Sequence, residues 1–288
     1  MDDTKPGGKP AWPTETTEDL LRIMARLRDP DGGCPWDVEQ DFASIAPYTI
    51  EEAYEVADAI EQGDMEGLRG ELGDLLLQVV FHAQMAREAG HFDYADVVHG
   101  IAEKMVVRHP HVFGDVSVED ADAQTRAWED QKAAERAEKA AAAGRTPSVL
   151  DDVARGLPAL MRAEKLQKRA ARVGFDWPDA APVFDKVREE LDEVRDVLDG
   201  GGDPAKVTDR LEDELGDLLF TCVNLARKLG TDPETALRRT IAKFERRFRA
   251  VEDMAAKDGK PLKDMDIDGL EAMWVRAKAA DKGPGPCS

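Results

Sequence analysis

Cysteine is scarce in this chain: its 288 residues include only Cys34, Cys222 and Cys287. These cysteines are widely separated, and none belongs to a closely spaced pair of the kind that binds zinc or carries out redox exchange. The spacing therefore argues against a disulfide scaffold and against a cysteine-ligated metal site. Unpaired thiols are typical of a reducing compartment, so we expect a cytoplasmic protein.

Long hydrophobic runs and positive charge are also lacking. No apolar stretch approaches the roughly 20 residues that a membrane-spanning helix needs, and the N-terminus has no signal-peptide core. Lys and Arg number 39 against 60 Asp and Glu, which gives a net charge of −21. A protein this acidic repels nucleic-acid backbones and anionic lipid, so we expect neither nucleic acid nor membrane as a partner. A phosphate-bearing ligand would need cations gathered locally.

Alternating apolar and polar residues, the usual pattern of a strand, are absent as well. Apolar residues recur instead at helical spacing, which predicts an all-α fold built of helical bundles. In the first half, we expect helices beginning at Thr17 and spanning Ile50–Gln62, Met65–Gly90 and Tyr94–Val107. In the second half, we expect them over 157–172, 182–199, 205–229 and from Pro233 to about Lys257.

An internal repeat organises the chain. The acidic stretch Glu51–Val56 matches Glu189–Val194, and Glu71–Leu76 is identical to Glu214–Leu219. The offsets are 138 and 143, so the difference of five residues falls between the two motifs, in the glycine-rich turn at 200–204. Loops tolerate such length changes better than packed helices. The sequence therefore predicts two copies of one helical unit.

The repeated acids have metal-binding spacing. Residues three apart share a helix face, so two adjacent helices would bring four carboxylates together. Such a group favours Mg²⁺, with Mn²⁺ as a substitute. The expected ligands are Glu190, Glu193, Glu214 and Asp217, with a possible second site at Glu52, Glu55, Glu71 and Asp74.

An ordinary solvated acidic face is the alternative explanation for these residues. The surrounding sequence argues against it, because Glu214, Asp217, Thr221 and Asn224 form one polar stripe on an otherwise apolar helix. A helix that is apolar nearly all round is usually buried, and buried carboxylates need a cation or another partner. We therefore expect the stripe to lie inside the protein.

A basic segment follows in the second half, where Lys243, Arg246 and Arg247 are spaced to share one helix face. Such a face could bind phosphate oxygens or could form salt bridges with neighbouring acids, and the residues alone leave both open. Trp274, taken by composition alone, would anchor a helix in the core. His109 and His111 flank Pro110, which prevents the i,i+4 chelation available on a helix.

From about Leu20 to Trp274 the chain resembles the MazG family of nucleoside triphosphate pyrophosphohydrolases. The resemblance rests on the acidic motifs in both halves together with Gly33–Asp37, Arg108–Phe113 and Lys243–Arg247. It implies tandem all-α units, Mg²⁺ and hydrolysis of nucleoside triphosphates between the α and β phosphates, with relaxed base specificity. It also implies a homodimer, catalysis in the C-terminal unit, and nucleotide contacts by the basic segment and Trp274.

Roles follow for several residues beside the acids. Glu189 precedes the ligand pair and could orient or deprotonate the attacking water, so Glu189 and Glu190 are the expected catalytic residues. Lys186 and Arg210 lie beside the two acidic motifs and could reach the phosphates. A non-catalytic module that senses nucleotides or binds a protein is the alternative function. It would not need four metal acids, Glu189 and a basic face together.

The repeat also sets the expected domain boundaries. The N-terminal unit spans 17–128 and the C-terminal, catalytic unit spans 151–280. Between them, residues 129–150 are rich in Ala, Glu, Lys and Arg and predict a helical connector. Residues 1–16 and 281–288 have the composition of a disordered lead-in and a flexible tail.

Overall fold

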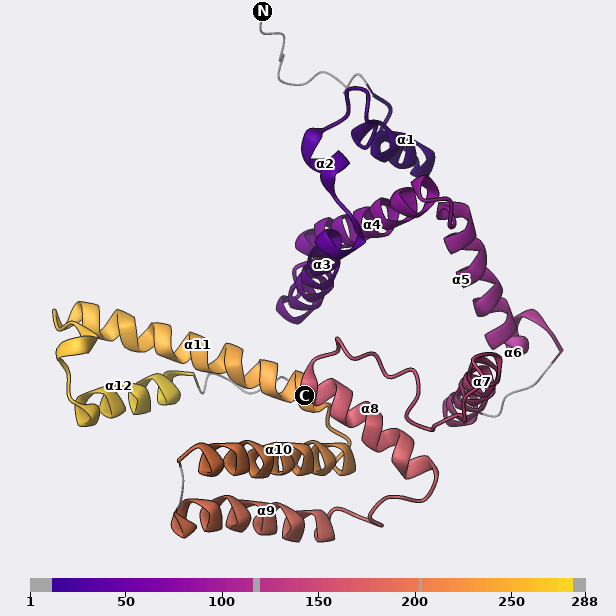
Figure 1. The fold of residues 1–288 in the computed structure, drawn as a ribbon. Coiled ribbons are helices and arrows are strands. Elements are labelled where there is room, and N and C mark those ends of the chain that lie inside the picture. The colour runs from indigo at the N-terminus through magenta and orange to yellow at the C-terminus, as the bar shows by residue number, and fades with distance from the viewer. Residues whose placement is uncertain (1–11, 116–119, 202–203, 282–288) are drawn as a thin grey trace, which may run out of the picture. The chain divides into compact units, whose positions relative to one another are not determined.

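A computed structural model describes residues 12–115, 120–201 and 204–281 of the chain (Figure 1). These residues form helices and no strand, which confirms the all-α prediction. The chain divides into two compact units, Met1–Gln131 and Lys132–Ser288. Among the residues that the structure describes, no helix combines the length and the apolar character needed to cross a membrane.

The first unit contains α1 (Thr17–Leu27), α2 (Pro35–Glu39), α3 (Phe42–Gln62), α4 (Met65–Glu88), α5 (Tyr94–Arg108), α6 (Pro110–Phe113) and the first half of α7 (Ala121–Ala142). The second contains α8 (Ala159–Arg172), α9 (Ala181–Gly200), α10 (Pro204–Lys228), α11 (Pro233–Lys257), the short 3₁₀ helix η1 (Leu262–Asp264) and α12 (Ile267–Ala280). Every helix predicted within the two units is present, but the connector predicted as helical over 129–150 is part of α7, which ends at Ala142. Helices α2 and α6 and the bounds of α12 were not predicted from the sequence.

The start of α3 differs from the prediction. We expected a helix from Ile50, but it begins at Phe42 and runs through Pro47. Its N-terminus is fixed by a capping box, in which Asp41 accepts from the Ser44 backbone N–H and the Ser44 side chain accepts from the backbone N–H of Asp41. The Asp-x-x-Ser pattern was the available signal. Pro47 lies near this end, where losing one helical hydrogen bond is tolerated because the cap stabilises the first turn.

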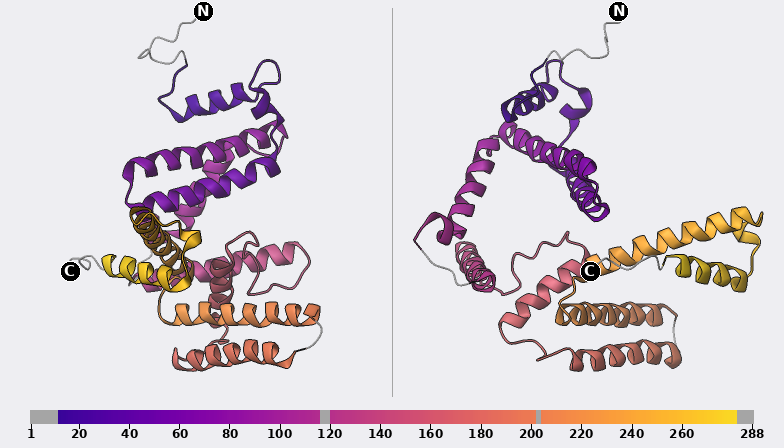
Figure 2. Two further views of the ribbon diagram at one scale, coloured as in Figure 1. Left: turned by 90° about the vertical axis from the view of Figure 1, so that its left-hand side faces the viewer. Right: turned by 180° about the vertical axis from the view of Figure 1, so that it is seen from behind.

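Apolar side chains from three helices form the core of the first unit. Met24 of α1, Ile45 of α3 and three residues of α4 are almost fully buried together; those three are Val80, Phe81 and Met85. Helices α3 and α4 lie side by side (Figure 2). A tight turn joins them, in which Gly63 takes the left-handed conformation at φ +70° and Asp64 caps α4.

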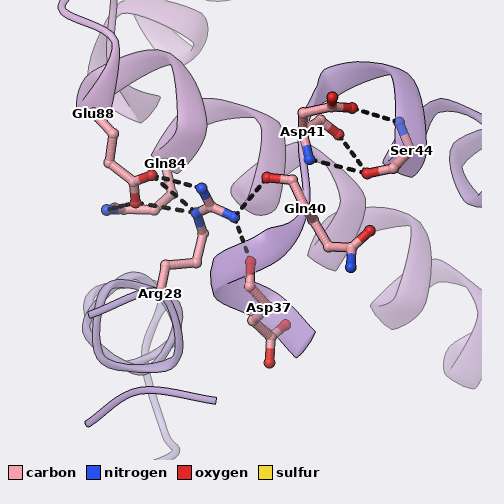
Figure 3. Close-up of polar contacts among 7 residues, drawn as sticks. All are labelled: Arg28, Asp37, Gln40, Asp41, Ser44, Gln84 and Glu88. Carbon is pink, nitrogen blue, oxygen red and sulfur yellow. Dashed lines mark hydrogen bonds and ion pairs between the residues drawn. The ribbon is translucent and has the colours of Figure 1, made fainter. Parts of the chain in front are cut away.

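Arg28 ties the end of α1 to the rest of this unit. Its guanidinium donates to the Glu88 carboxylate at 2.7–3.1 Å and to the carbonyl oxygens of Asp37 and Gln40 (Figure 3). It also lies 5.3 Å from the centroid of the Phe81 ring. Since only 8% of the Arg28 side chain is exposed, the guanidinium acts as a buried cross-link between α1, α2 and α4.

In the second unit, α9 and α10 form the corresponding helix pair (Figures 1 and 2). Val183, Val197 and Val223 are buried in these two helices. The chain before α9 is held by Asp176, whose carboxylate pairs with Arg227 and Lys228 near the end of α10. A separate apolar cluster, formed by Val251, Ala255, Met273 and Ala277, joins α11 to α12.

The surface of α10 corrects one expectation. We expected this helix to be buried nearly all round, but Leu215, Leu219 and Phe220 are 46%, 57% and 44% exposed. Thr221 and Asn224 are buried as predicted. The apolar residues of α10 therefore divide between a face packed within the chain and a face left open on it.

Candidate active site

Three carboxylates converge between α9 and α10. Glu190 and Glu193 are one turn apart on α9, and Glu214 reaches them from α10. One oxygen from each carboxylate lies within 4.8 Å of the others. Glu190 is only 4% exposed. The side-by-side packing of these helices therefore gathers the acids as the repeat predicts, and three oxygen donors at this spacing suit a hard divalent cation.

The charges of this group are not independent. A hydrogen bond with Glu190 is the largest cause that raises the pKa of Glu193 above its usual value. Burial and the negative charges of Glu190 and Glu214 raise this pKa further, while the charge of Lys186 opposes them. Neighbouring carboxylates repel one another when both are ionised. A bound cation would remove the repulsion, so the donor set fits Mg²⁺ or Mn²⁺.

Lys186 neutralises part of this charge. Its Nζ lies 2.8 Å from Oε1 of Glu189 and 2.9 Å from Oε1 of Glu190. Hydrogen bonds to Glu189 and Glu190 are the chief causes that raise the pKa of Lys186. Glu189 itself is exposed, with 59% of its side chain open to solvent. The ammonium group thus connects the proposed base with the buried carboxylate.

Asp217 and Arg210 stand apart from this group. Asp217 lies one turn after Glu214 on α10, but it is exposed and its oxygens do not belong to the group of three. Arg210 lies one turn before Glu214 and is also exposed. The predicted four-carboxylate cluster is therefore a cluster of three with a fourth acid at its edge.

The first unit repeats the arrangement on α3 and α4. Oxygens of Glu52, Glu55 and Glu71 lie within 4.8 Å of one another. Burial raises the pKa of Glu52, and the charge of Asp74 adds to the shift. Burial likewise raises the pKa of Glu71, and the charge of Glu55 is the next cause. Asp74 thus acts on this group through its charge while remaining outside the three close oxygens.

The two acidic groups differ in one neighbour. Glu52 matches Glu190 in the repeat, and the position four residues earlier is Tyr48 in the first unit and Lys186 in the second. Tyr48 is exposed and packs edge-on against Trp36, with ring centroids 6.2 Å apart. Only the second copy therefore places an ammonium group in direct contact with its acids at this position.

The basic segment lies on α11. Arg246 and Arg247 both pair with Asp281 at the end of α12. No ion pair joins Lys243, Arg246 or Arg247 to the four predicted metal acids within the described parts of the chain. Phe244, between these cations, lies 5.3 Å from Trp274 between ring centroids. The structure thus brings the segment together with Trp274, and among the described residues no ion pair joins it to the acidic group.

Sequence reasoning missed Asp281, which it assigned to the C-terminal tail. The structure makes Asp281 the C-cap residue of α12, whereas 282–288 fall outside the described residues. Trp274 packs against the α11–α12 cluster and is half-buried, so it also anchors the helix as its composition suggested. Near the N-terminus, residues 1–11 of the expected lead-in lie outside the described residues, and Thr16 caps α1.

The histidines of the first unit form a small aromatic group. The His109 ring lies 5.7 Å from His111 and 5.2 Å from Trp128, measured between centroids. Nδ1 of His109 is 2.6 Å from the carbonyl oxygen of Met105, and Nε1 of Trp128 donates to the carbonyl of Arg108 at 2.7 Å. These contacts hold the start of α7 to the end of α5.

Comparison with known proteins agrees with this arrangement. A family model described as "MazG nucleotide pyrophosphohydrolase domain" matches residues 40–113 and 183–251, once in each unit. An Escherichia coli protein named nucleoside triphosphate pyrophosphohydrolase is 55% identical over 90% of this chain and 95% of its own length. A Thermotoga maritima protein named nucleoside triphosphate pyrophosphohydrolase/pyrophosphatase MazG is 43% identical over 92% of this chain and 96% of its own. The Bacillus subtilis protein YabN, uncharacterised by name, is 44% identical over 90% of this chain and 51% of its own length.

Proposed function

Because the chain belongs to the MazG nucleotide pyrophosphohydrolase family, we propose that it hydrolyses nucleoside triphosphates between the α and β phosphates. The products are a nucleoside monophosphate and pyrophosphate. The observation that carries the proposal is the group of three carboxylates at Glu190, Glu193 and Glu214, with Lys186 and Glu189 in contact beside it. A nucleotide-sensing or protein-binding module, the alternative function, has no need of such a group.

The metal would be Mg²⁺, with Mn²⁺ as a substitute. Glu190, Glu193 and Glu214 would hold it, with Asp217 completing the set from the edge. When bound, Mg²⁺ supplies positive charge that offsets the charge of the phosphates. The raised pKa of Glu193 supports this assignment, because carboxylates that repel one another when ionised favour a bound cation.

The second unit would supply the remaining chemistry. Glu189 is exposed and held by Lys186, so its carboxylate can orient a water and accept its proton as the bond to phosphorus forms. Lys186 and Arg210 would donate to phosphate oxygens. Lys186 is already within hydrogen-bond distance of both glutamates, so a phosphate bound there would face the water-orienting carboxylate.

Lys243, Arg246, Arg247 and Trp274 would form the rest of the nucleotide surface. The arginines are suited to phosphate oxygens because each guanidinium presents paired N–H donors. Trp274 would contact the base by stacking, which tolerates any base because every base has a π-face. This supports relaxed base specificity, which the family resemblance also implies.

We also propose a homodimer in the cytoplasm. Leu215, Leu219 and Phe220 leave an apolar face on α10 that a second copy would cover. Analytical ultracentrifugation of the full chain tests this, and a monomer at concentrations above those of the activity assay would contradict it.

Product analysis tests the proposed reaction. Wild type, Glu190→Ala and Glu52→Ala are incubated with Mg²⁺ and a panel of ribo- and deoxyribonucleoside triphosphates, with chelator as the metal-free control. We expect monophosphate and pyrophosphate, lost at least about a hundredfold in Glu190→Ala and largely kept in Glu52→Ala. Diphosphate and phosphate as products would contradict the bond assignment. Loss only in Glu52→Ala would move the active site to the first unit, and binding without turnover would favour the sensing module.

A further inference from the structure

One carboxylate holds both arginines of the basic segment. Oδ1 of Asp281 accepts from Nε of Arg246 at 2.7 Å, and Oδ2 accepts from Nη2 of Arg246 at 3.0 Å. The same Oδ2 accepts from Nε of Arg247 at 2.7 Å. The side chains of Asp281 and Arg247 are only 16% and 18% exposed, so their contact is mostly shielded from water, whereas 62% of the Arg246 side chain is exposed.

Helix geometry explains why such a contact is needed. Arg246 and Arg247 are consecutive on α11, and consecutive side chains leave a helix about 100° apart around its axis. Without a common partner, the two guanidinium groups would spread over different faces. Asp281 approaches from the neighbouring helix and brings both to one place. Since Asp281 follows Trp274 by two turns on α12, that place is fixed relative to the indole.

Asp281 leaves most of the binding capacity of the arginines available. Each guanidinium carries five N–H donors, and only three of these ten donors are used on Asp281. Both terminal nitrogens of Arg247 make no hydrogen bond to the described residues. With Lys243 included, three cations and one carboxylate leave a net charge of +2. The pair can therefore bind a phosphate while it remains attached to Asp281.

We propose that Asp281 is a positioning residue for nucleotide binding. It holds the guanidinium groups of Arg246 and Arg247 on the side of α11 next to Trp274, so that both can donate to the phosphates of one nucleotide. The inference rests on the proposed function, because it takes these arginines as phosphate ligands. Asp281 itself does not touch the substrate.

The test uses Asp281→Asn in the full chain, with Glu271→Gln as the matched control. Glu271 is exposed on the same helix, forms no ion pair within the described residues, and its variant changes the net charge equally. Asp281→Glu and Arg247→Ala complete the set. Binding of a non-hydrolysable triphosphate analogue, KM and kcat are measured for each, and circular dichroism confirms the helix content.

We expect Asp281→Asn to raise the Kd of the analogue and KM about fivefold, with kcat changed less than about twofold. Arg247→Ala should raise Kd and KM further. In the double variant Asp281→Asn should raise these constants by a smaller factor than it does in the wild type, because Asp281 acts through the arginines. Asp281→Glu should recover part of the affinity, which a purely structural defect in α12 would not allow.

Three results would overturn the inference, each in a different way. A lower Kd in Asp281→Asn would show that the carboxylate competes with phosphate. If Asp281→Asn and Glu271→Gln had the same Kd for the analogue while Arg247→Ala lost affinity, Asp281 would have no role in nucleotide binding but the basic segment would. Unchanged affinity in all variants would remove the segment as well, while product analysis would still decide the reaction separately.

Discussion

Replacing Lys186 by methionine should destabilise the metal-free protein by about 2 kcal/mol. The ammonium group makes two contacts, and their surroundings differ. The contact with Glu189 is largely exposed, since 59% of that side chain is open to solvent. Exposed pairs of this kind on one helix contribute about 0.3–0.5 kcal/mol.

The contact with Glu190 accounts for the larger share. The Glu190 side chain is only 6% exposed, and Lys186 is 31% exposed. Breaking a fully buried pair costs about 3–5 kcal/mol, and the partial exposure of Lys186 reduces this to about 1–2 kcal/mol. Methionine keeps the length and apolar stem of lysine, so the lost stability measures the contribution of the charge and not that of packing.

Urea denaturation followed by circular dichroism, with chelator and with saturating Mg²⁺, measures the effect. Mg²⁺ should reduce the difference in free energy of unfolding between variant and wild type to less than about 1 kcal/mol. The cation replaces the lost positive charge, and it binds more tightly once Lys186 no longer competes for the carboxylates. Arg188→Met is the control, since its pair with Asp185 is 73% and 78% exposed. Equal losses in both variants, or a gap that Mg²⁺ leaves unchanged, would refute the reasoning.

Three further changes test other parts of the molecule. Asp176→Asn should cost about 1–2 kcal/mol at pH 7. Hydrogen bonds chiefly from Arg227 lower the pKa of Asp176 from 3.8 to about 2. The stabilisation is therefore complete above about pH 4 and is lost as pH falls toward 2. If urea denaturation gave the same difference in free energy of unfolding between variant and wild type at pH 7 and pH 3, this would be contradicted. Glu214→Gln should raise the Mg²⁺ concentration for half-maximal turnover about tenfold. Asp217→Asn should raise that concentration less, because only Glu214 belongs to the close group. A Mg²⁺ titration in which Asp217→Asn had the larger effect would contradict the ligand assignment. Arg28→Met should destabilise the first unit by about 2 kcal/mol, since it removes a buried guanidinium that pairs with the partly exposed Glu88 and donates to two backbone carbonyls. Hydrogen exchange in α4 should rise while turnover is kept, and lost turnover with unchanged exchange would argue against catalysis in the second unit.

The helical plan could be predicted because its signals are local. Residues three apart on a helix share a face in any structure, so the pairs Glu190–Glu193 and Glu52–Glu55 followed from spacing alone. The meeting of α9 with α10 followed from the repeat, because the same motif pair in both halves implies the same packing. Gly90, which takes φ +72° after α4, marked the end of that helix for the same local reason.

The predictions that were wrong concern contacts between different helices. The stripe on α10 was expected to be buried along its length, but Glu214 is half-buried and Asp217 is exposed, whereas Thr221 and Asn224 are buried. The partner of Arg246 lies 35 residues away at the end of another helix, so no spacing rule identifies it. Asp281 also follows a segment whose composition gave no sign of a capped helix end. Ion pairs between helices can be identified only once the packing of those helices is known.

The two copies share their close carboxylates but differ in some of the neighbouring cations. Both keep three carboxylates whose oxygens lie within 4.8 Å of one another, so the close acidic group is present in each copy. The cations differ more, because Tyr48 stands where the second copy has Lys186, and Val107 stands opposite Arg246, although Lys104 and Arg108 match Lys243 and Arg247. A site with acids alone can gather a divalent ion, but it offers fewer donors to the oxygens of a triphosphate. The second unit combines both sets, which is the reason to expect hydrolysis chiefly there.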